Sequence, residues 1–168
     1  MRKVTVTDYQ PEWRQQFQLA AKELRELFGA ECIEIHHIGS TSIEGMAAKP
    51  VIDLMPVVRE IEVVDGLISE MEKRGYESKG ENGLPGRRYF QRGGDERTHH
   101  VHIYAAGNPE IDRHLAFRNY LRENPQEAEK YGILKKKLAH DFPYDIEQYI
   151  AGKERLVARI EKNARGET

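Results

Sequence analysis

Two apolar segments separated by a Gly-Ser turn constrain the fold of this chain most strongly. Residues 51–58 are apolar at nearly every position, which predicts a central strand with both faces buried. Residues 32–38 alternate in polarity and are rich in isoleucine, which predicts another strand. The short polar sequence Gly-Ser-Thr-Ser at 39–42 breaks the chain between them. Because both faces of the central strand need cover, we expect a sheet flanked by helices.

Helical periodicity accounts for most of the remaining chain. Apolar residues recur every three or four positions in segments that begin or end near proline, glycine or aspartate. These patterns predict helices over residues 11–28, 61–74, 114–122, 125–138 and 146–160. Shorter strands are predicted near residue 76, at 87–91 and at 98–104. The order predicts an α+β fold with a small mixed sheet, flanking helices and a helical C-terminal portion, in one domain over residues 1–168.

The charge balance and the single cysteine limit the partners and the compartment. The 26 basic and 28 acidic residues leave a formal net charge of -2, so we expect neither a nucleic-acid partner nor membrane association. Cys32 cannot form an internal disulfide, which fits a reducing compartment. The N-terminus lacks a signal-peptide core, and no apolar stretch approaches the ~20 residues of a spanning helix. These features predict a cytoplasmic protein and leave its oligomeric state open.

Asp53 is the sharpest chemical signal, because it is the one carboxylate inside the apolar segment 51–58. A buried carboxylate is costly unless it is paired or binds a metal. The structural alternative pairs Asp53 with Lys49, Arg87 or Arg88. The Gly-Ser turn thirteen residues before it favours the functional interpretation, in which Asp53 is a catalytic, metal-binding residue.

The Gly-Ser turn is a candidate phosphate site. Glycine allows close approach to a ligand, and Gly39, Ser40 and Thr41 offer backbone N–H groups and hydroxyls to a phosphate. The alternative is an ordinary tight turn with capping residues. Arg87 and Arg88 are candidate clamps for an anionic substrate, against the alternative of a solvated charged face. The basic run at 135–137 is predicted to be a solvated helix face.

His100 and His102 form a second candidate pair. Residues two apart on a strand share one face, so both imidazoles could bind a divalent metal. With Asp53 they would hold Mg, Mn or Zn. His37, which leads into the turn, could join them, and His99 is predicted to lie on the opposite face. The structural alternative is that one histidine donates to a neighbour and the other is half exposed.

These motifs and their order resemble those of the GrpB family of small bacterial proteins. The matching segments are residues 36–58, 86–93, 99–104 and 117–139. The family is similar to the nucleotidyltransferase superfamily, which implies that fold. That superfamily combines a Gly-Ser turn with an Asp-x-Asp strand and a later carboxylate, and these hold two Mg²⁺ ions for attack on a nucleotide phosphate.

The resemblance carries over only in part at the level of single residues. Gly39 and Ser40 match the turn, and Asp53 matches the first carboxylate. Met55 stands where the second carboxylate is expected, and His102 stands where the third is expected. Methionine is a poor ligand for a hard cation, and imidazole favours softer metals than Mg²⁺.

Three functions are therefore expected as alternatives. The first is a nucleotidyltransferase-like enzyme that transfers a nucleotidyl or phosphoryl group with a metal held by Asp53 and the histidines. The second is a non-catalytic protein that binds a nucleotide, a CoA-like metabolite or another anion. The third is a metal-dependent phosphohydrolase that uses water as the nucleophile. In each case the partner is a small-molecule nucleotide or anionic metabolite.

Overall fold

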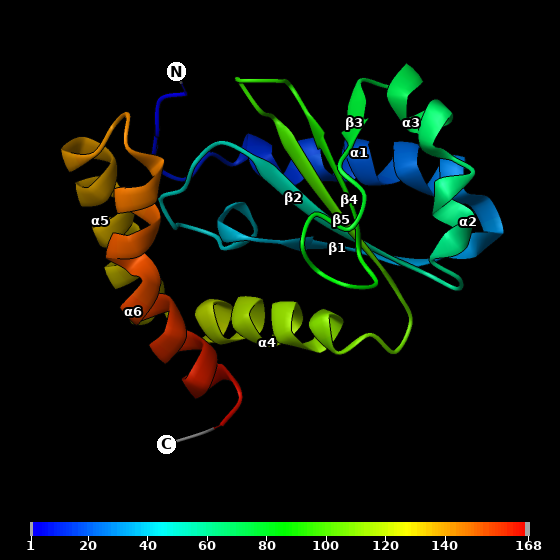
Figure 1. Cartoon of the computed structure of the whole chain (residues 1–168). Coiled ribbons are helices and arrows are strands. Elements are labelled where there is room, and N and C mark those ends of the chain that lie inside the picture. Colours follow the sequence, from blue (N-terminus) through cyan, green and yellow to red (C-terminus); the bar gives the residue numbers. More distant parts are fainter. Residues whose placement is uncertain (1, 167–168) are drawn as a thin grey trace.

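The computed structural model describes residues 2–166, which form six α-helices and five β-strands (Figure 1). The strands are β1 (Cys32–Ile38), β2 (Ile52–Val58), β3 (Tyr76–Ser78), β4 (Arg88–Arg92) and β5 (His99–Ala105). The helices are α1 (Glu12–Phe28), α2 (Glu62–Asp65), α3 (Ile68–Lys73), α4 (Pro109–Glu123), α5 (Pro125–Asp141) and α6 (Ile146–Ala164). Two short 3₁₀ turns, η1 (Gly29–Glu31) and η2 (Ser40–Ser42), flank β1. The predicted α+β class is confirmed.

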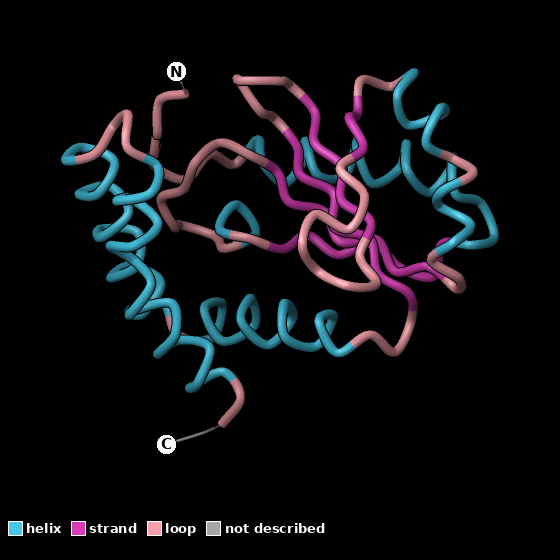
Figure 2. Tube along the Cα trace, viewed as in Figure 1, coloured by secondary structure: helices cyan, strands magenta, loops and turns pink. Residues whose placement is uncertain are grey.

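The strands form one mixed sheet in the order β1-β2-β5-β4-β3, which occupies the centre of the tube in Figure 2. β2 pairs with β1 antiparallel and with β5 parallel, and the remaining neighbours are antiparallel. β2 is therefore an interior strand, as its apolar sequence predicts. The parallel register places Asp53 beside His100 on β5.

Helix α1 covers one face of the sheet and runs across it in Figure 1. Its buried residues Trp13 and Leu24 belong to the same apolar core as Leu54 of β2 and Val101 of β5. Gly29 follows the helix with φ 58°, which suits glycine and ends α1 where the sequence predicts. Each fully buried large apolar side chain contributes about 1.5–3 kcal/mol, so this core anchors the sheet.

Helix α4 covers part of the opposite face. Ile111 and Leu115 of α4 pack against Met55, Ile38 and Tyr104. Asp53 lies two residues before Met55 on β2 and shares its face, because side chains alternate along a strand. Helices α5 and α6 pack beside α4 at one end of the sheet, opposite the end that carries α2 and α3 (Figure 1). Within residues 2–166, no helix is both long and apolar enough to cross a bilayer.

Two helix predictions differ from the structure. The segment predicted as one helix over 61–74 forms α2 and α3, because the chain turns at Gly66, a residue with low helix propensity. Helix α4 begins at Pro109 rather than at 114. The Asn108 side chain accepts a hydrogen bond from the backbone N–H of Glu110 at 2.9 Å, and proline suits the first helical position.

Candidate functional site

Asp53, His100 and His102 meet on the face of the sheet that α4 partly covers. His102 lies two residues beyond His100 on β5 and shares its face. Asp53 Oδ1 lies 3.0 Å from His102 Nε2 and 3.4 Å from His100 Nδ1. One potential ligand atom from each residue lies within 4.8 Å of the other two. The acid and the histidines singled out from the sequence therefore converge, and we call them the Asp-His triad.

The carboxylate of the Asp-His triad is held in its charged form. Burial alone would raise the pKa of Asp53, but hydrogen bonds from His100 and His102 outweigh burial and hold that pKa well below its usual range. The Asp53 side chain is 23% exposed, so solvent or a ligand can reach it. An ionised carboxylate beside two imidazoles is a donor set that suits a divalent cation.

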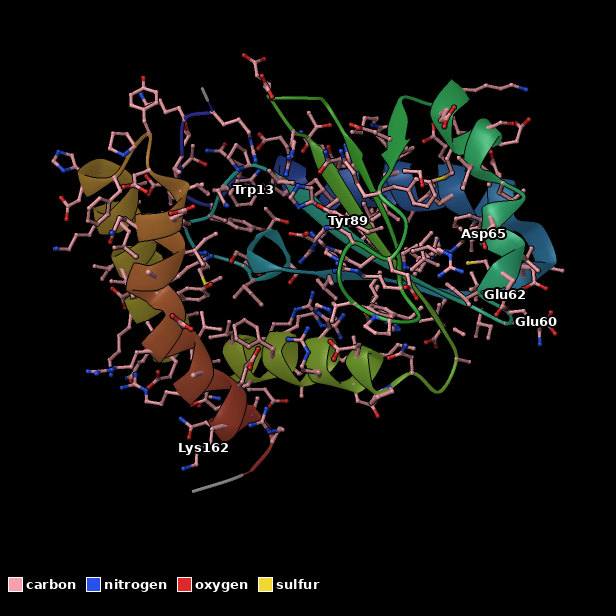
Figure 3. All side chains as sticks on the ribbon, viewed as in Figure 1. Trp13, Glu60, Glu62, Asp65, Tyr89 and Lys162 are labelled. Carbon is pink, nitrogen blue, oxygen red and sulfur yellow. The ribbon has the colours of Figure 1, made fainter. Side chains whose placement is uncertain are left out.

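Packing against Tyr89 of β4 orients both rings of the triad. The Tyr89 ring centroid lies 5.2 Å from that of His102 and 5.7 Å from that of His100, and Figure 3 labels Tyr89 on the sheet. The outer ring nitrogens, His100 Nε2 and His102 Nδ1, are buried and have no hydrogen-bond partner within residues 2–166. The contacts with Tyr89 and Asp53 therefore keep the inner nitrogens directed at the carboxylate.

The Gly-Ser turn lies directly against Asp53. Gly39 has φ 73°, a conformation that side chains rarely adopt. A Cβ at this position would overlap Asp53 Oδ2 and would lie 2.9 Å from the carboxyl carbon. Glycine is therefore required at 39 both by the backbone and by the close approach of the turn to the carboxylate.

We expect Gly39→Ala to destabilise the protein by about 1–3 kcal/mol through backbone strain and, in addition, to displace the Asp53 side chain. Urea unfolding measures the first effect, and titration with Mn²⁺ measures the second. Gly45→Ala is the matched control, because Gly45 also has positive φ, at 82°, but a Cβ there meets no atom within 4 Å. Equal loss of metal affinity in both variants would contradict the proposed contact.

The turn residues Ser40 and Thr41 line the same cavity as Asp53. Thr41 Oγ1 lies 3.0 Å from His37 Nε2 and donates to the Val51 carbonyl at 3.3 Å. His37 does not join the triad: its ring stacks on Phe17 of α1 at 4.6 Å, on the other side of the sheet. This follows from strand alternation, because His37 pairs with Leu54, which also faces α1.

The structure does not bring the two candidate arginines to the cavity. Arg88 Nε donates to Asp65 Oδ1 at 2.7 Å, and Figure 3 labels Asp65 on α2, at the far end of the sheet. Arg87 is buried and donates to the carbonyls of Glu81 at 3.1 Å and Asn82 at 2.8 Å. Within the described part of the chain, Asp53 forms no ion pair with Arg87, Arg88 or Lys49. Asp53 is therefore paired with two histidines and not with the lysine or arginines that the structural alternative named.

A cavity of about 310 Å³ adjoins the Asp-His triad, and helices α4, α5 and α6 supply much of its wall. Asp53 and His100 line it together with the turn residues 39–41. It is rich in cations, which come from the N-terminal segment, the segment before β2 and all three helices: Arg2, Lys49, Arg113, Lys135 and Lys153. The acidic residues in its wall are Asp53 and Glu161, and Glu161 pairs with Arg113 at 3.1 Å.

Lys135 corrects the prediction of a solvated basic face at 135–137. Its exposed fraction is 2%, whereas Lys136 and Lys137 are exposed. The physical reason is helical spacing: Lys135 follows the buried Tyr131 by four residues and precedes the buried Leu138 by three, so it lies on the inner face of α5. The spacing of Lys135 from Tyr131 and Leu138 can be read from the sequence and indicates that Lys135 lies on the buried face of the helix.

A mixed sheet with a Gly-Ser turn ahead of an acid-bearing strand is the architecture of a nucleotidyltransferase-like fold. The structure of the Cid1 poly(U) polymerase matches with a TM-score of 0.54 at 14% identity, covering 79% of this chain and 42% of that one. At that identity the likeness shows the fold alone. The chain belongs to the GrpB family, since the family model described as GrpB protein matches residues 3–163.

Two further relatives agree with the family assignment. The UPF0157 protein YqkA of Bacillus subtilis (strain 168) is 52% identical over 164 residues, which cover 98% of this chain and 48% of YqkA. This chain therefore spans about half the length of YqkA. The crystal structure of conserved protein GrpB from Enterococcus faecalis matches with a TM-score of 0.92 at 52% identity, covering 95% of this chain and 96% of that one.

Proposed function

We propose that this protein transfers a nucleotidyl or phosphoryl group with the help of one divalent metal held by Asp53, His100 and His102. The observation that carries the proposal is the convergence of three ligand atoms within 4.8 Å of one another, beside a close-packed Gly-Ser turn. The nucleotidyltransferase-like fold supports the same class of reaction. The acceptor is left unassigned.

The residues present fit a single metal of intermediate softness. Two imidazole nitrogens and one carboxylate oxygen suit Zn²⁺ or Mn²⁺ better than Mg²⁺, which prefers oxygen ligands only. Three protein ligands leave coordination positions for a substrate oxygen. A metal bound there would supply Lewis-acid polarisation of a phosphoryl oxygen.

Met55 argues against a second metal. It occupies the position of the second superfamily carboxylate, is 0% exposed, and packs under α4 with Ile38 and Tyr104. A thioether in an apolar cluster offers no ligand to a hard cation. In the proposed reaction, the Ser40 hydroxyl and the backbone N–H groups of Ser40 and Thr41 would bind phosphate oxygens, and the cavity lysines would balance negative charge.

The test compares His100→Ala/His102→Ala with His99→Ala after chelator treatment. His99 is the neighbouring histidine and contacts Arg92 instead of Asp53, with His99 Nε2 3.3 Å from Arg92 Nη2. We expect the double variant to lose Mn²⁺ or Zn²⁺ binding by calorimetry. It should also lose all metal-dependent release of the leaving group from nucleoside triphosphates, which is pyrophosphate in nucleotidyl transfer and the nucleoside diphosphate in phosphoryl transfer. The His99 variant should retain both. Equal metal affinity in the two variants would refute the metal site.

Binding without turnover is the second candidate, and Met55 is the observation that favours it. With one carboxylate instead of two, the site lacks the second metal that the superfamily uses on the leaving group. Wild-type protein that binds nucleotide and metal but releases neither pyrophosphate nor nucleoside diphosphate in the same assay would support binding alone. Cleavage of the nucleotide with water as the acceptor of the transferred group would instead indicate a phosphohydrolase.

A further inference from the structure

Three lysine amines gather around two buried tyrosine rings in the cavity wall. Lys135 Nζ lies 4.5 Å from the centroid of the Tyr131 ring. Lys49 Nζ and Lys153 Nζ lie 5.1 Å and 4.9 Å from the centroid of the Tyr149 ring. They come from three separate elements: the segment before β2, α5 and α6. We call these three residues the lysine cluster.

The lysine cluster has no anionic partner of its own. Within residues 2–166, no carboxylate forms an ion pair with Lys49, Lys135 or Lys153, and Lys135 Nζ is buried without any hydrogen-bond partner. Burial lowers the pKa of Lys135 to about 7, with further lowering from Lys153 and Lys49. Burial likewise lowers the pKa of Lys153 to about 8. A buried ammonium is costly unless it is paired, so the cluster lacks the counter-charge that would stabilise it.

We propose that the lysine cluster binds a chain of two or three linked phosphates. Three amines that line one cavity match the several negative charges of a di- or triphosphate better than the single charge of a carboxylate ligand. The lysine cluster lines the same cavity of about 310 Å³ as Asp53 and His100 of the Asp-His triad, so one ligand can contact both groups. The identification of these linked phosphates as the terminal part of a nucleoside triphosphate rests on the proposed function. The binding of linked phosphates by the lysine cluster does not depend on it.

The test measures binding of inorganic triphosphate by calorimetry, in the presence of chelator so that no metal contributes. Lys135→Met keeps most of the apolar part of the side chain and removes the charged amine. Lys137→Met is the matched control on the same helix, since Lys137 is exposed and pairs with Asp141 at 3.1 Å. We expect Lys135→Met to weaken binding about tenfold or more, and Lys137→Met to change it less than about twofold.

A second variant and two further ligands complete the test. Lys153→Met should also weaken binding about tenfold, and it carries the test if the Lys135 variant does not fold. Orthophosphate should bind much more weakly than triphosphate. Adenosine triphosphate binding more tightly than inorganic triphosphate would identify a nucleotide as the source of the phosphates, and equal affinity would identify an inorganic chain. Unchanged affinity in both lysine variants, or equal affinity for orthophosphate, would overturn the proposal.

The outcomes separate this proposal from the proposed function. Lysine-dependent triphosphate binding in a protein that shows no metal-dependent transfer would support the lysine cluster and refute the transferase. Metal-dependent transfer that both lysine variants retain with an unchanged KM would support the transferase and refute the lysine cluster.

Discussion

Asp53→Asn is expected to lower the affinity for Mn²⁺ or Zn²⁺ by about a hundredfold or more, because loss of a direct ligand should exceed the roughly 10- to 100-fold cost of losing an outer-shell partner. Metal-dependent release of pyrophosphate or nucleoside diphosphate should fall to background. Asparagine keeps the shape of the side chain and can still hydrogen-bond to His102, which lies 3.0 Å from the carboxylate. The expected loss is therefore one of charge and not of packing. Calorimetric titration of chelator-treated protein measures it.

Asp65→Asn is the matched control for this substitution. Asp65 is also a paired carboxylate, with Arg88 at 2.7 Å, but it lies on α2 at the far end of the sheet. We expect its metal affinity and turnover to equal those of the wild type. If Asp53→Asn bound metal as tightly as Asp65→Asn, the Asp-His triad would be a structural hydrogen-bond network and not a metal site.

Lys135→Met is expected to raise the free energy of unfolding, by up to a few kcal/mol at neutral pH in buffer free of phosphate. The folded state holds the pKa of Lys135 at about 7, against an ordinary value of 10.5. A lowered lysine pKa means that the folded protein binds fewer protons than the unfolded chain between these two values, so the penalty is complete below about pH 7 and shrinks as the pH rises toward 10.5. Methionine removes the charge and fills most of the same volume.

The pH dependence makes this prediction specific. The stabilisation by Lys135→Met should be constant below about pH 7 and should decline between about pH 7 and 10, as measured by urea unfolding at a series of pH values. Lys153 and Lys49 repel the same amine, and Asp53 attracts it, so the two lysines should also be easier to protonate in the variant. Lys137→Met should change stability by less than about 0.5 kcal/mol. A less stable Lys135 variant, or a gain independent of pH, would contradict a buried unpaired ammonium.

The local order of the chain could be predicted well from the sequence. The apolar run that became β2 and the isoleucine-rich run that became β1 specify strands through side-chain type and period, and α1 ends at Gly29 as expected. Asp53 was recognisable because a carboxylate is costly inside an apolar strand, and His100 and His102 because residues two apart on a strand share one face. The break within 61–74 was missed because the apolar period continues through Gly66 although the helix does not.

The sequence by itself determined the sheet-forming segments, the family resemblance and the identity of the acid and the two histidines. Only the tertiary structure decided which charges share a site. Parallel pairing of β2 with β5 brought Asp53 to residues 47 and 49 positions away along the chain, whereas strand alternation placed His37 against α1. Packing of α5 and α6 buried Lys135 and placed the half-buried Lys153 in the same cavity, whereas Arg88 is paired with Asp65 on α2. Local periods are set within a few residues, but the pairing of distant charges depends on how the layers pack.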